Sequence, residues 1–359
     1  MSKVLMKGNE AIAEAAIRAG CLNYFAYPIT PQSEVAEYLA WRMPEVGGLF
    51  LQGESEVAVS YMIHGAAAAG ARVFTTSSSP GISLMSEAIS YMAGAQCPAV
   101  FVNIMRGGPG LGGILPSQAD YLQATKGIGH GDARMLVMAP ATVQEAVEMM
   151  MMAFPLAEKY RNPVMILGDG LIGQMMEPVE FPDHLKTEPT NKDQWATNGM
   201  HTRGGDSQNI VRTLFLDPTE LNTNNLVLKA KYDRMHREDV RHEAYNLDGA
   251  YTLLLVSYGT MSRVCKTAID ILKEQGVPVG LIRPQTLFPF PEEAVLKAAE
   301  GPGCRQVLCV EMSMGQMVED VQRSLKGRKP VRWYGKCGGD IPTPEEIIEL
   351  IQTTMARRQ

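Results

Sequence analysis

YTLLLVSYGTMSRVCKTAIDILKEQGVPVGLI, residues 251–282, contains one complete strand–helix–strand unit. The apolar run YTLLLVSYG at its start is typical of a buried strand. The stretch Ser262–Gln275 has the spacing of a helix, and Gly276 stands where a helix commonly ends. A second apolar run, VPVGLI, follows directly. This order predicts two neighbouring parallel strands in a sheet that helices cover.

The same alternation extends in both directions from this unit. Two more strands are predicted after it, at RQVLCV (305–310) and PVRWYG (330–335). Thr142 and Glu145, three residues apart, have the pattern of a capping box at a helix start. The fold class that follows is α/β, with two doubly wound, mostly parallel sheet domains. Apolar segments separated by helical stretches precede the unit at residues 24–27, 48–52, 72–76, 99–104, 134–138 and 163–168.

Residues 182–247 interrupt the alternation. This segment is polar, contains many Asn, Thr, Gly and His residues, and ends in a charged helical stretch around Lys229–Glu243. We therefore predict an irregular linker between two domains. The first domain would comprise residues 1–181 and the second residues 248–359.

Composition excludes several classes of function. The 359 residues carry a formal net charge of −6, whereas a nucleic-acid partner requires a basic face. One short basic cluster, Lys326–Arg332, reads as a solvated turn. No apolar run reaches the roughly 20 residues of a membrane span, and the N-terminus turns polar too early for a signal peptide. We expect a cytoplasmic protein that binds neither nucleic acid nor membrane.

The six cysteines also agree with a cytoplasmic protein, because they are scattered along the sequence and form no Cys-x-x-Cys pair. This pattern predicts neither a disulfide framework nor a cysteine-ligated zinc or iron–sulfur site. No metal ligand is assigned in this chain.

Ligands of open parallel sheets bind at the carboxyl ends of the strands, so the loops there are the candidates for chemistry. The first loop is Tyr27-Pro28-Ile29-Thr30-Pro31-Gln32-Ser33. Thr30 followed by Pro31 has the pattern of a helix N-cap and first helical residue. The same geometry could receive a carboxylate or phosphate at a helix N-terminus.

The second loop carries two acids, Glu54 and Glu56, at the start of a helix. Acids in a first helical turn interact favourably with the helix dipole and commonly have no other role. His64 lies two turns further along an Ala-rich stretch and has the setting of a core histidine. The third loop, Thr75–Gly81, is rich in hydroxyls that could cap a helix or contact a polar ligand.

The fourth loop begins with Arg106 and continues as GGPGLGG, residues 107–113. Its glycines match the G-x-G-x-x-G fingerprint of a nicotinamide dinucleotide site. The acid near the expected offset, Asp132, precedes a strand instead of ending one, so it is poorly placed to hold a ribose. An arginine before a flexible loop is better suited to bind a small carboxylate with two hydrogen bonds.

Gly168-Asp169-Gly170 with Asn198 also matches, in letters, the Mg²⁺–diphosphate motif of thiamine enzymes. Three prolines between Gly170 and Asn198 oppose the continuous helix and strand that would bring the asparagine back. We interpret the match as a turn at the end of a strand.

Taken together, four stretches resemble the pyrimidine-binding domain of 2-oxoacid:ferredoxin oxidoreductases. They are YPITPQSE (27–34), QGESEVAVSYMIHGAAAAGA (52–71), FTTSSSPGISLMSE (74–87) and VNIMRGGPGLGG (102–113). The second domain resembles the transketolase-C-like domain of the same alpha-type subunit, through SYGT, IRPQTLFPFP, EMSMGQM and GGDIPTPEEI. The length and residues 210–245 are most similar to the branched-chain enzyme, which uses 3-methyl-2-oxobutanoate.

The resemblance implies roles for individual residues. Glu56 matches the catalytic glutamate that hydrogen-bonds the aminopyrimidine ring of thiamine diphosphate. Thr30 and Arg106 match the residues that bind the carboxylate and carbonyl of the substrate. The resemblance also assigns Tyr27, Pro28 and Ile29, which precede Thr30 in the first loop, to the binding of the cofactor.

The resemblance also implies a reaction and partners. A 2-oxoacid, coenzyme A and oxidised ferredoxin would give an acyl-coenzyme A, CO₂ and reduced ferredoxin. Mg²⁺ and the [4Fe-4S] clusters would reside on partner subunits: a pyrophosphate-domain chain, a ferredoxin-like chain and a third, gamma-type chain. Two alternatives stay open at this point, namely a subunit of another thiamine enzyme or a nicotinamide dinucleotide dehydrogenase.

Overall fold

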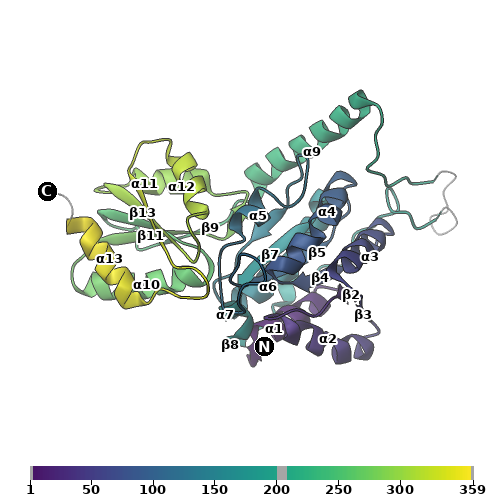
Figure 1. The fold of residues 1–359 in the computed structure, drawn as a ribbon, viewed down its shortest axis with the longest axis horizontal. Coiled ribbons are helices and arrows are strands. Elements are labelled where there is room, and N and C mark those ends of the chain that lie inside the picture. The colour runs from purple at the N-terminus through teal and green to yellow at the C-terminus, as the bar shows by residue number, and fades with distance from the viewer. Residues whose placement is uncertain (1–2, 200–207, 357–359) are drawn as a thin grey trace.

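The computed structural model describes residues 3–199 and 208–356, which contain two large sheets with helices on both faces (Figure 1). The first sheet has the strand order β12-β6-β7-β5-β4-β2-β3 and is parallel except at β12, which pairs antiparallel with β6. The predicted α/β class is confirmed. The strands of this sheet are β2 (Asn23–Ala26), β3 (Leu49–Gln52), β4 (Phe74–Ser77), β5 (Val100–Met105), β6 (Leu136–Met138), β7 (Val164–Asp169) and β12 (Thr286–Phe288).

The helices of the first domain form two layers. Because the crossovers are right-handed, a helix that connects to a strand further along the sheet in one direction lies on one face. A helix that connects in the opposite direction lies on the other face. One layer is α1 (Gly8–Arg18), α2 (Ser33–Glu45) and α6 (Val143–Tyr160), which contact one another through α1. The other is α3 (Glu56–Ala68) and α4 (Ser79–Gly94), with the short α5 (Tyr121–Thr125) following β5. A small two-stranded antiparallel sheet, formed by β1 (Val4–Lys7) and β8 (Met176–Val179), lies next to α7 (Gly170–Gln174).

The second sheet has the order β14-β13-β10-β11-β9, with only β9 antiparallel to its neighbour. The predicted unit at residues 251–282 forms as expected. Gly276, with φ of +73°, follows the end of its helix in the left-handed conformation that glycine adopts without strain. Its elements are β9 (His242–Tyr245), β10 (Leu253–Val256), α10 (Gly259–Glu274), β11 (Val279–Pro284), α11 (Glu292–Ala299), β13 (Gln306–Glu311), α12 (Met317–Leu325), β14 (Val331–Gly335) and α13 (Pro344–Ala356).

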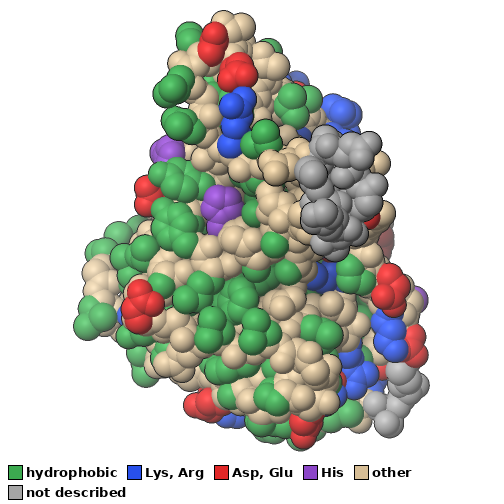
Figure 2. Space-filling model, turned by 90° about the vertical axis from the view of Figure 1, so that its right-hand side faces the viewer, with side chains coloured by type: hydrophobic (Ala, Val, Ile, Leu, Met, Phe, Trp, Pro, Cys, Tyr) green, Lys and Arg blue, Asp and Glu red, His purple; other side chains and the backbone are tan. Residues whose placement is uncertain are grey.

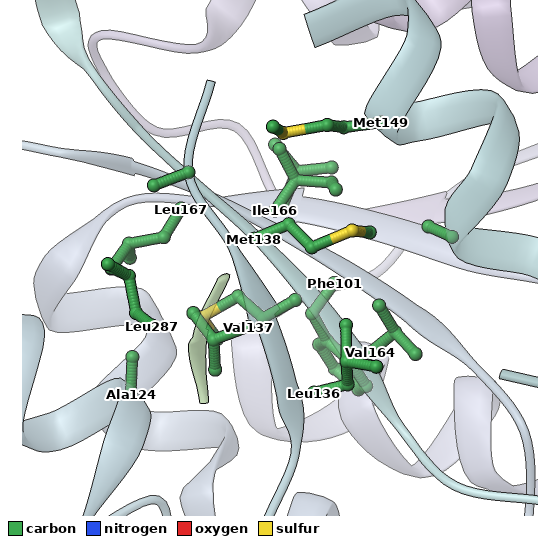
Figure 3. Packing of buried hydrophobic residues seen from close by; sticks show 14 of the residues in the cluster. Phe101, Ala124, Leu136, Val137, Met138, Met149, Val164, Ile166, Leu167 and Leu287 are labelled. Carbon is green, nitrogen blue, oxygen red and sulfur yellow. The ribbon is translucent and has the colours of Figure 1, made fainter. Parts of the chain in front are cut away.

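The core of the first domain sits between the central strands and α6. The four central strands β4 to β7 are buried along almost their whole length, as parallel strands covered on both faces should be. Figure 3 shows side chains of β6 and β7 packed with Phe101 and Met149, and Leu287 of β12 among them. A residue from the C-terminal half thus completes the N-terminal core.

Residues 182–247 contain more regular structure than the sequence suggested. The helix there, α9 (Pro218–Glu238), begins eleven residues before the predicted start at Lys229 and ends before β9. Asp217 caps it by accepting hydrogen bonds from the amides of Thr219 and Glu220 at 2.6 and 3.3 Å. The helical prediction for residues 239–243 was wrong, because this stretch turns into a strand that pairs with β11. Residues 200–207 lie outside the described part. We keep the boundaries 1–181, 182–247 and 248–359 as a proposal.

A buried ion pair fastens the early part of this segment to the first domain. Arg72 forms a salt bridge with Glu158 at 2.8 Å and donates to the carbonyl of Thr187 at 2.9 Å. Lys192, also buried, approaches the same carboxylate at 3.0 Å. Because burying unpaired charges is unfavourable, these three groups must stay together.

A second ionic group joins the two sheets. The fully buried Arg283 of β11 donates to both carboxylate oxygens of Glu145 and, at 2.6 Å, to Glu243.

The capping box predicted at Thr142 is half correct. The Glu145 amide donates to the Thr142 hydroxyl at 3.1 Å, but the Glu145 carboxylate accepts from the amide of Ala141 and from Arg283 instead of from Thr142. None of the helices in the described residues combines the length and apolar character that crossing a membrane requires.

Candidate active site

Four loops meet at one edge of the first sheet. Strands β5, β4, β2 and β3 are parallel neighbours, so the segments that follow them all leave from the same side. These segments hold every site residue that the sequence analysis selected. They are residues 27–33 after β2, 53–56 after β3, 77–81 at the end of β4, and 106–116 after β5.

Glu56 is the first residue of α3 and is only 6% exposed. Ser55 caps this helix through a 3.2 Å hydrogen bond from the Ala58 amide, which turns Glu56 inward. Within residues 3–199 and 208–356, no group forms a hydrogen bond or ion pair with the Glu56 carboxylate. Neither carboxylate oxygen is among the fully enclosed unpartnered atoms, so the carboxylate faces a small opening in which a ligand can reach it.

The N-terminus of α4 is shaped around this carboxylate. A Cβ atom at Gly81 would lie 2.8 Å from Oε1 of Glu56 and 2.1 Å from Oγ of Ser77. Both contacts are shorter than real Cβ atoms show, so a side chain at this position would push Ser77 and Glu56 out of their present places. Ser77 and Glu56 therefore lie against the same small space, which a side chain at position 81 would fill.

Two other groups of the second loop and its helix are placed differently. Glu54 is exposed, in contrast to Glu56 two residues later. His64 is half-buried, and burial lowers its pKa. It lies eight residues after Glu56, about 12 Å along the helix axis, so the two side chains cannot act on one small group.

Unpartnered buried polar atoms gather at this edge of the sheet. Eleven side-chain nitrogen or oxygen atoms are buried without a hydrogen-bond partner among the described residues, and five of them belong to this region. Since buried polar groups normally find partners, such a group of exceptions is typical of a ligand site. The five are Nε2 of Gln32, Oγ1 of Thr75, Oγ of Ser77, Oγ of Ser78 and Nε of Arg106.

The structure brings Arg106 and Thr30 together. Arg106 directly follows β5 and is 7% exposed, and its Nη1 donates to the carbonyl of Thr30 at 2.9 Å. Its Nη2 donates to the carbonyl of Leu111 at 3.2 Å. These bonds use two of the five guanidinium N–H donors. The remaining three, including the unpartnered Nε–H, can bind a planar carboxylate.

The expectation that Thr30 caps a helix was wrong. Helix α2 begins at Ser33, and Gln32 occupies the N-cap position without a side-chain cap bond. The Thr30 side chain is exposed and does not cap the helix. Tyr27 and Ile29 are half-buried and Pro28 is exposed in the same turn. No described contact joins these three side chains to Glu56, so their part in cofactor binding stays a prediction.

The glycine loop after Arg106 folds back on itself instead of opening a helix. Arg106 bridges to Pro116, and the Gly107 amide donates to the carbonyl of Leu115 at 3.0 Å. The next helix, α5, starts only at Tyr121. A dinucleotide site needs a helix N-terminus at its glycine fingerprint. The dehydrogenase alternative therefore lacks its central structural element.

Asp169 is occupied as a helix cap. Its fully buried carboxylate accepts hydrogen bonds from the amides of Leu171 and Ile172 at 2.9 and 3.2 Å, and burial raises its pKa. Asn198 instead donates to Asp193 at 3.0 Å. Residues 3–199 and 208–356 hold no group of three or more His, Cys, Asp or Glu side chains arranged for a metal ion.

One supporting residue of the site was not predicted from the sequence. Asp120, in the loop before α5, hydrogen-bonds Ser79 and Asn103 beside Arg106. It carries no local signal, because an aspartate before a short helix is common at N-caps. Gly81 and Ser77 belong to the third loop, Thr75–Gly81, for which the sequence allowed either a helix cap or a contact with a polar ligand.

Comparison with known proteins gives consistent matches over the whole chain. Residues 14–242 match the family model "Pyruvate flavodoxin/ferredoxin oxidoreductase, thiamine diP-bdg", and residues 252–347 match "Pyruvate:ferredoxin oxidoreductase core domain II". The ketoisovalerate oxidoreductase subunit VorB of Methanothermobacter thermautotrophicus is 46% identical over 352 residues, with 98% of each chain covered. The 2-oxoglutarate synthase subunit KorA of the same organism is 36% identical, with 96% and 97% covered.

A solved structure is similar in three dimensions as well. The 2-oxoglutarate:ferredoxin oxidoreductase from Magnetococcus marinus, with 2-oxoglutarate, coenzyme A and succinyl-CoA bound, superposes with a TM-score of 0.88 at 26% sequence identity. The match covers 98% of this chain and 65% of that one. This chain thus spans about two thirds of that larger relative.

Proposed function

Because this chain belongs to the pyruvate flavodoxin/ferredoxin oxidoreductase family, we propose that it forms half of a thiamine-diphosphate site in a complex that oxidises branched-chain 2-oxoacids. The preferred substrate is 3-methyl-2-oxobutanoate, which coenzyme A and ferredoxin convert to the acyl-coenzyme A, CO₂ and reduced ferredoxin. The observation that carries this proposal is the buried, unpartnered carboxylate of Glu56 beside Gly81.

The residues at this edge fit the pyrimidine end of the cofactor. Thiamine diphosphate, when bound, supplies the carbanion chemistry that breaks the bond between the carboxylate and carbonyl carbons. Glu56 would hold the proton that its carboxyl shares with a ring nitrogen of the aminopyrimidine. The unpartnered hydroxyls of Ser77 and Ser78 offer further hydrogen bonds to a polar ring edge.

Arg106 and Thr30 would bind the substrate. The planar guanidinium holds the carboxylate through its unused N–H groups, and the exposed Thr30 hydroxyl can donate to the carbonyl oxygen. Holding both groups fixes the bond that breaks relative to the cofactor, and such positioning contributes a large part of many enzymes' rates.

The apolar residues of the loop after Arg106 favour a substrate with an apolar side chain. Leu111, Ile114 and Leu115 are 84%, 59% and 56% exposed there. Apolar groups beside the carboxylate-binding arginine suit the isopropyl group of 3-methyl-2-oxobutanoate. 2-Oxoglutarate would instead need a second cation for its distal carboxylate. The higher identity to the ketoisovalerate subunit agrees with this choice.

The other half of the site would come from partner subunits. A pyrophosphate-domain chain would provide Mg²⁺ and diphosphate binding, since the Asp169 carboxylate caps α7. A ferredoxin-like chain would carry the [4Fe-4S] clusters, and a gamma-type chain would complete the assembly.

Figure 2, which views the end of the molecule that contains α3 and β3, displays apolar side chains gathered on this face. Exposed apolar residues of β3, α3 and α4 are Leu49, Leu51, Val57, Tyr61 and Leu84. Contiguous apolar surface of this kind favours protein contact.

The test is a substrate series on the native complex. Coenzyme A-dependent reduction of ferredoxin should be fastest, in kcat/KM, with 3-methyl-2-oxobutanoate, followed by other branched 2-oxoacids. A complex that prefers 2-oxoglutarate would refute the substrate assignment. A complex without visible iron–sulfur absorption that reduces no ferredoxin would refute the reaction.

A further inference from the structure

A carboxylate that the mechanism above does not use lies beside the end of β5. Asp120 accepts hydrogen bonds through Oδ2 from the Ser79 hydroxyl at 2.6 Å and from the Asn103 amide group at 2.9 Å. Burial raises the pKa of Asp120, and these two hydrogen bonds oppose the rise. Asp120 occupies the N-cap position of α5 but forms no side-chain cap bond there. Capping therefore does not explain this carboxylate.

Of the two partners of Asp120, Ser79 is hydrogen-bonded directly to Arg106, and Asn103 is connected to Arg106 through Ser79. The Arg106 amide donates to Oγ of Ser79 at 3.0 Å, and the Ser79 amide donates to Oδ1 of Asn103 at 3.1 Å. A closed set of hydrogen bonds thus joins β5, the first residue of α4 and the loop at Asp120. The position of the arginine backbone depends on this set.

The Ser79 hydroxyl has one proton and two possible acceptors. The Asp120 carboxylate lies 2.6 Å away, whereas the Arg106 carbonyl lies 3.3 Å away. The charged, nearer acceptor takes the proton, because hydrogen bonds to ions are shorter and stronger. A lone pair of Ser79 then remains directed at the Arg106 amide. Without Asp120 the hydroxyl can turn to the carbonyl, and the lone pairs of Oγ then reorient relative to the Arg106 amide, which weakens that hydrogen bond.

The second sheet domain holds Asp120 in place. The Gln118 amide donates to the carbonyl of Met312 at 2.9 Å, and the Gln118 side-chain oxygen accepts from the Met312 amide at 3.0 Å. The side-chain nitrogen of Gln118 donates to the carbonyl of Tyr258 at 2.9 Å. Gln316 donates to the carbonyl of Ala119 at 2.6 Å. Residues 118 and 119, which precede Asp120, are therefore held by the segments next to β13, α10 and α12 and not by the first domain alone.

We propose that Asp120 is a positioning residue, which holds Ser79 and thereby sets where the Arg106 guanidinium meets the substrate carboxylate. This inference rests on the proposed function, because it takes Arg106 as the carboxylate-binding group. It also gives residues 248–359 a part in substrate binding, which they exert through Gln118 and Asp120.

The experiment compares Asp120→Ala and Asp120→Asn in the native complex. Asp120→Ala should raise the KM for the 2-oxoacid by about tenfold or more, the effect of losing a hydrogen bond to a charged group. The value of kcat and the affinity for thiamine diphosphate should change by less than about threefold. Asp120→Asn should restore most of the KM, since its amide oxygen can accept both hydrogen bonds.

Asp239→Ala is the matched control. Asp239 is also a buried aspartate with two partners, Tyr160 at 2.6 Å and Lys159 at 2.7 Å, but it lies between the ends of α6 and α9 and contacts neither Ser79 nor residues 118–120. Its loss should lower the melting temperature and leave the KM for the 2-oxoacid unchanged. If Asp120→Ala does not fold, Ser79→Ala removes the same link with a smaller change and should raise the same KM.

Coupling to Arg106 separates positioning from general stability. In an Arg106→Ala background, Asp120→Ala should add nothing to the KM, because the group it positions is absent. An unchanged KM in both Asp120→Ala and Ser79→Ala, or independent effects in the double variant, would overturn the inference. Those results would leave the wild-type oxidation of 2-oxoacids intact. Failure of the wild-type complex to oxidise any 2-oxoacid would refute the proposed function instead.

Discussion

Glu54 and Glu56 are two residues apart and chemically identical, yet their surroundings differ completely. Glu54 is exposed, while Glu56 is buried against Gly81 without a partner. Water surrounds the first carboxylate, and no described group of the chain donates a hydrogen bond to the second. A proton-holding role suits only the buried one, because its proton can be shared with a bound ring and not with solvent.

Replacing Glu56 by Gln should therefore abolish most activity without unfolding the protein. General acid–base groups contribute about 10²- to 10⁴-fold to rates, and a loss in that range is expected in kcat of the complex. The melting temperature should stay the same or rise, since a neutral amide is easier to bury than an unpaired carboxylate.

Glu54→Gln is the control for this variant. As an exposed change it should alter kcat by no more than about twofold. Equal losses in both variants, or full activity in Glu56→Gln, would remove Glu56 from the catalytic role.

Arg106→Lys should not behave as a conservative change. A lysine ammonium cannot keep the bonds to the Thr30 and Leu111 carbonyls and still present a planar pair of donors. Loss of a charge-assisted hydrogen bond, worth about 1.5–3 kcal/mol, should lower kcat/KM for the 2-oxoacid about 10- to 150-fold. Affinity for thiamine diphosphate should barely change. Unaltered kinetics would exclude Arg106 from the substrate site.

At the scale of elements, α9 is attached to the first domain through an unusual group. Its Lys231 is only 9% exposed, and the ammonium donates to the carbonyl of Arg161 at 3.2 Å. Burial, and then the nearby Arg161 cation, lowers the pKa of Lys231 to about 7. In the unfolded chain the pKa is near 10.5. Between these values the unfolded state binds more protons, so this lysine makes stability rise with pH from about 7 to 10.

Lys231→Met should remove that dependence. At pH 6 both states of the wild-type lysine are protonated and the full penalty of burying the charge applies. The variant should therefore gain on the order of 1–3 kcal/mol in the free energy of unfolding there. The gain should shrink by pH 9, when the buried amine is neutral. Urea unfolding of the purified chain at both pH values measures it.

Lys229→Met, two residues earlier on the same helix, is the control. Lys229 is exposed and pairs with Asp233 at 2.6 Å. Exposed pairs contribute less than about 1 kcal/mol, so this variant should show little difference between the two pH values. A larger gain for Lys231→Met at pH 9 than at pH 6 would contradict the assignment of a buried, neutral amine.

At the scale of the whole molecule, the two sheet domains depend on each other, and the proposed function assigns the second half of the active site to a partner subunit. Strand β12 of the C-terminal half pairs with β6, and Arg283 holds Glu145 and Glu243 together across the junction. The site edge around Glu56 and Arg106 offers groups for a pyrimidine and a 2-oxoacid. The candidate diphosphate ligand Asp169 is committed to capping α7.

The isolated chain should accordingly bind neither iron nor thiamine diphosphate appreciably. Mg²⁺ requires several oxygen ligands in near-octahedral arrangement, and the oxygen of Asp169 that caps α7 already accepts two amide hydrogen bonds. Calorimetric titration of the lone subunit with thiamine diphosphate and Mg²⁺ is the measurement.

In the full complex, Asp169→Ala should leave cofactor affinity nearly unchanged while costing about 1 kcal/mol of stability as a lost cap. Asp169→Asn keeps the capping oxygen and should restore that stability. Micromolar, Mg²⁺-dependent binding by the lone chain that Asp169→Ala abolishes would show that the chain owns a complete cofactor site.

Local sequence patterns determined the elements of this fold. Strands such as β5, β7 and β13 lie within two residues of their predicted positions, and Gly276 ends α10 as expected. Apolar spacing and glycine at helix ends act over a few residues, so they can be read without knowing what is distant. For the same reason the sequence identified all four loops of the candidate site.

Only the tertiary structure decided which distant residues meet. It placed β12 in the first sheet, drew the Glu145 carboxylate to Arg283, and freed Thr30 from the capping role that its neighbours suggested. It also left Glu56 buried without a partner and set Asp120 beside Ser79. These outcomes depend on contacts between segments many residues apart. Their energies come from packing and desolvation in the assembled molecule, which no local spacing encodes.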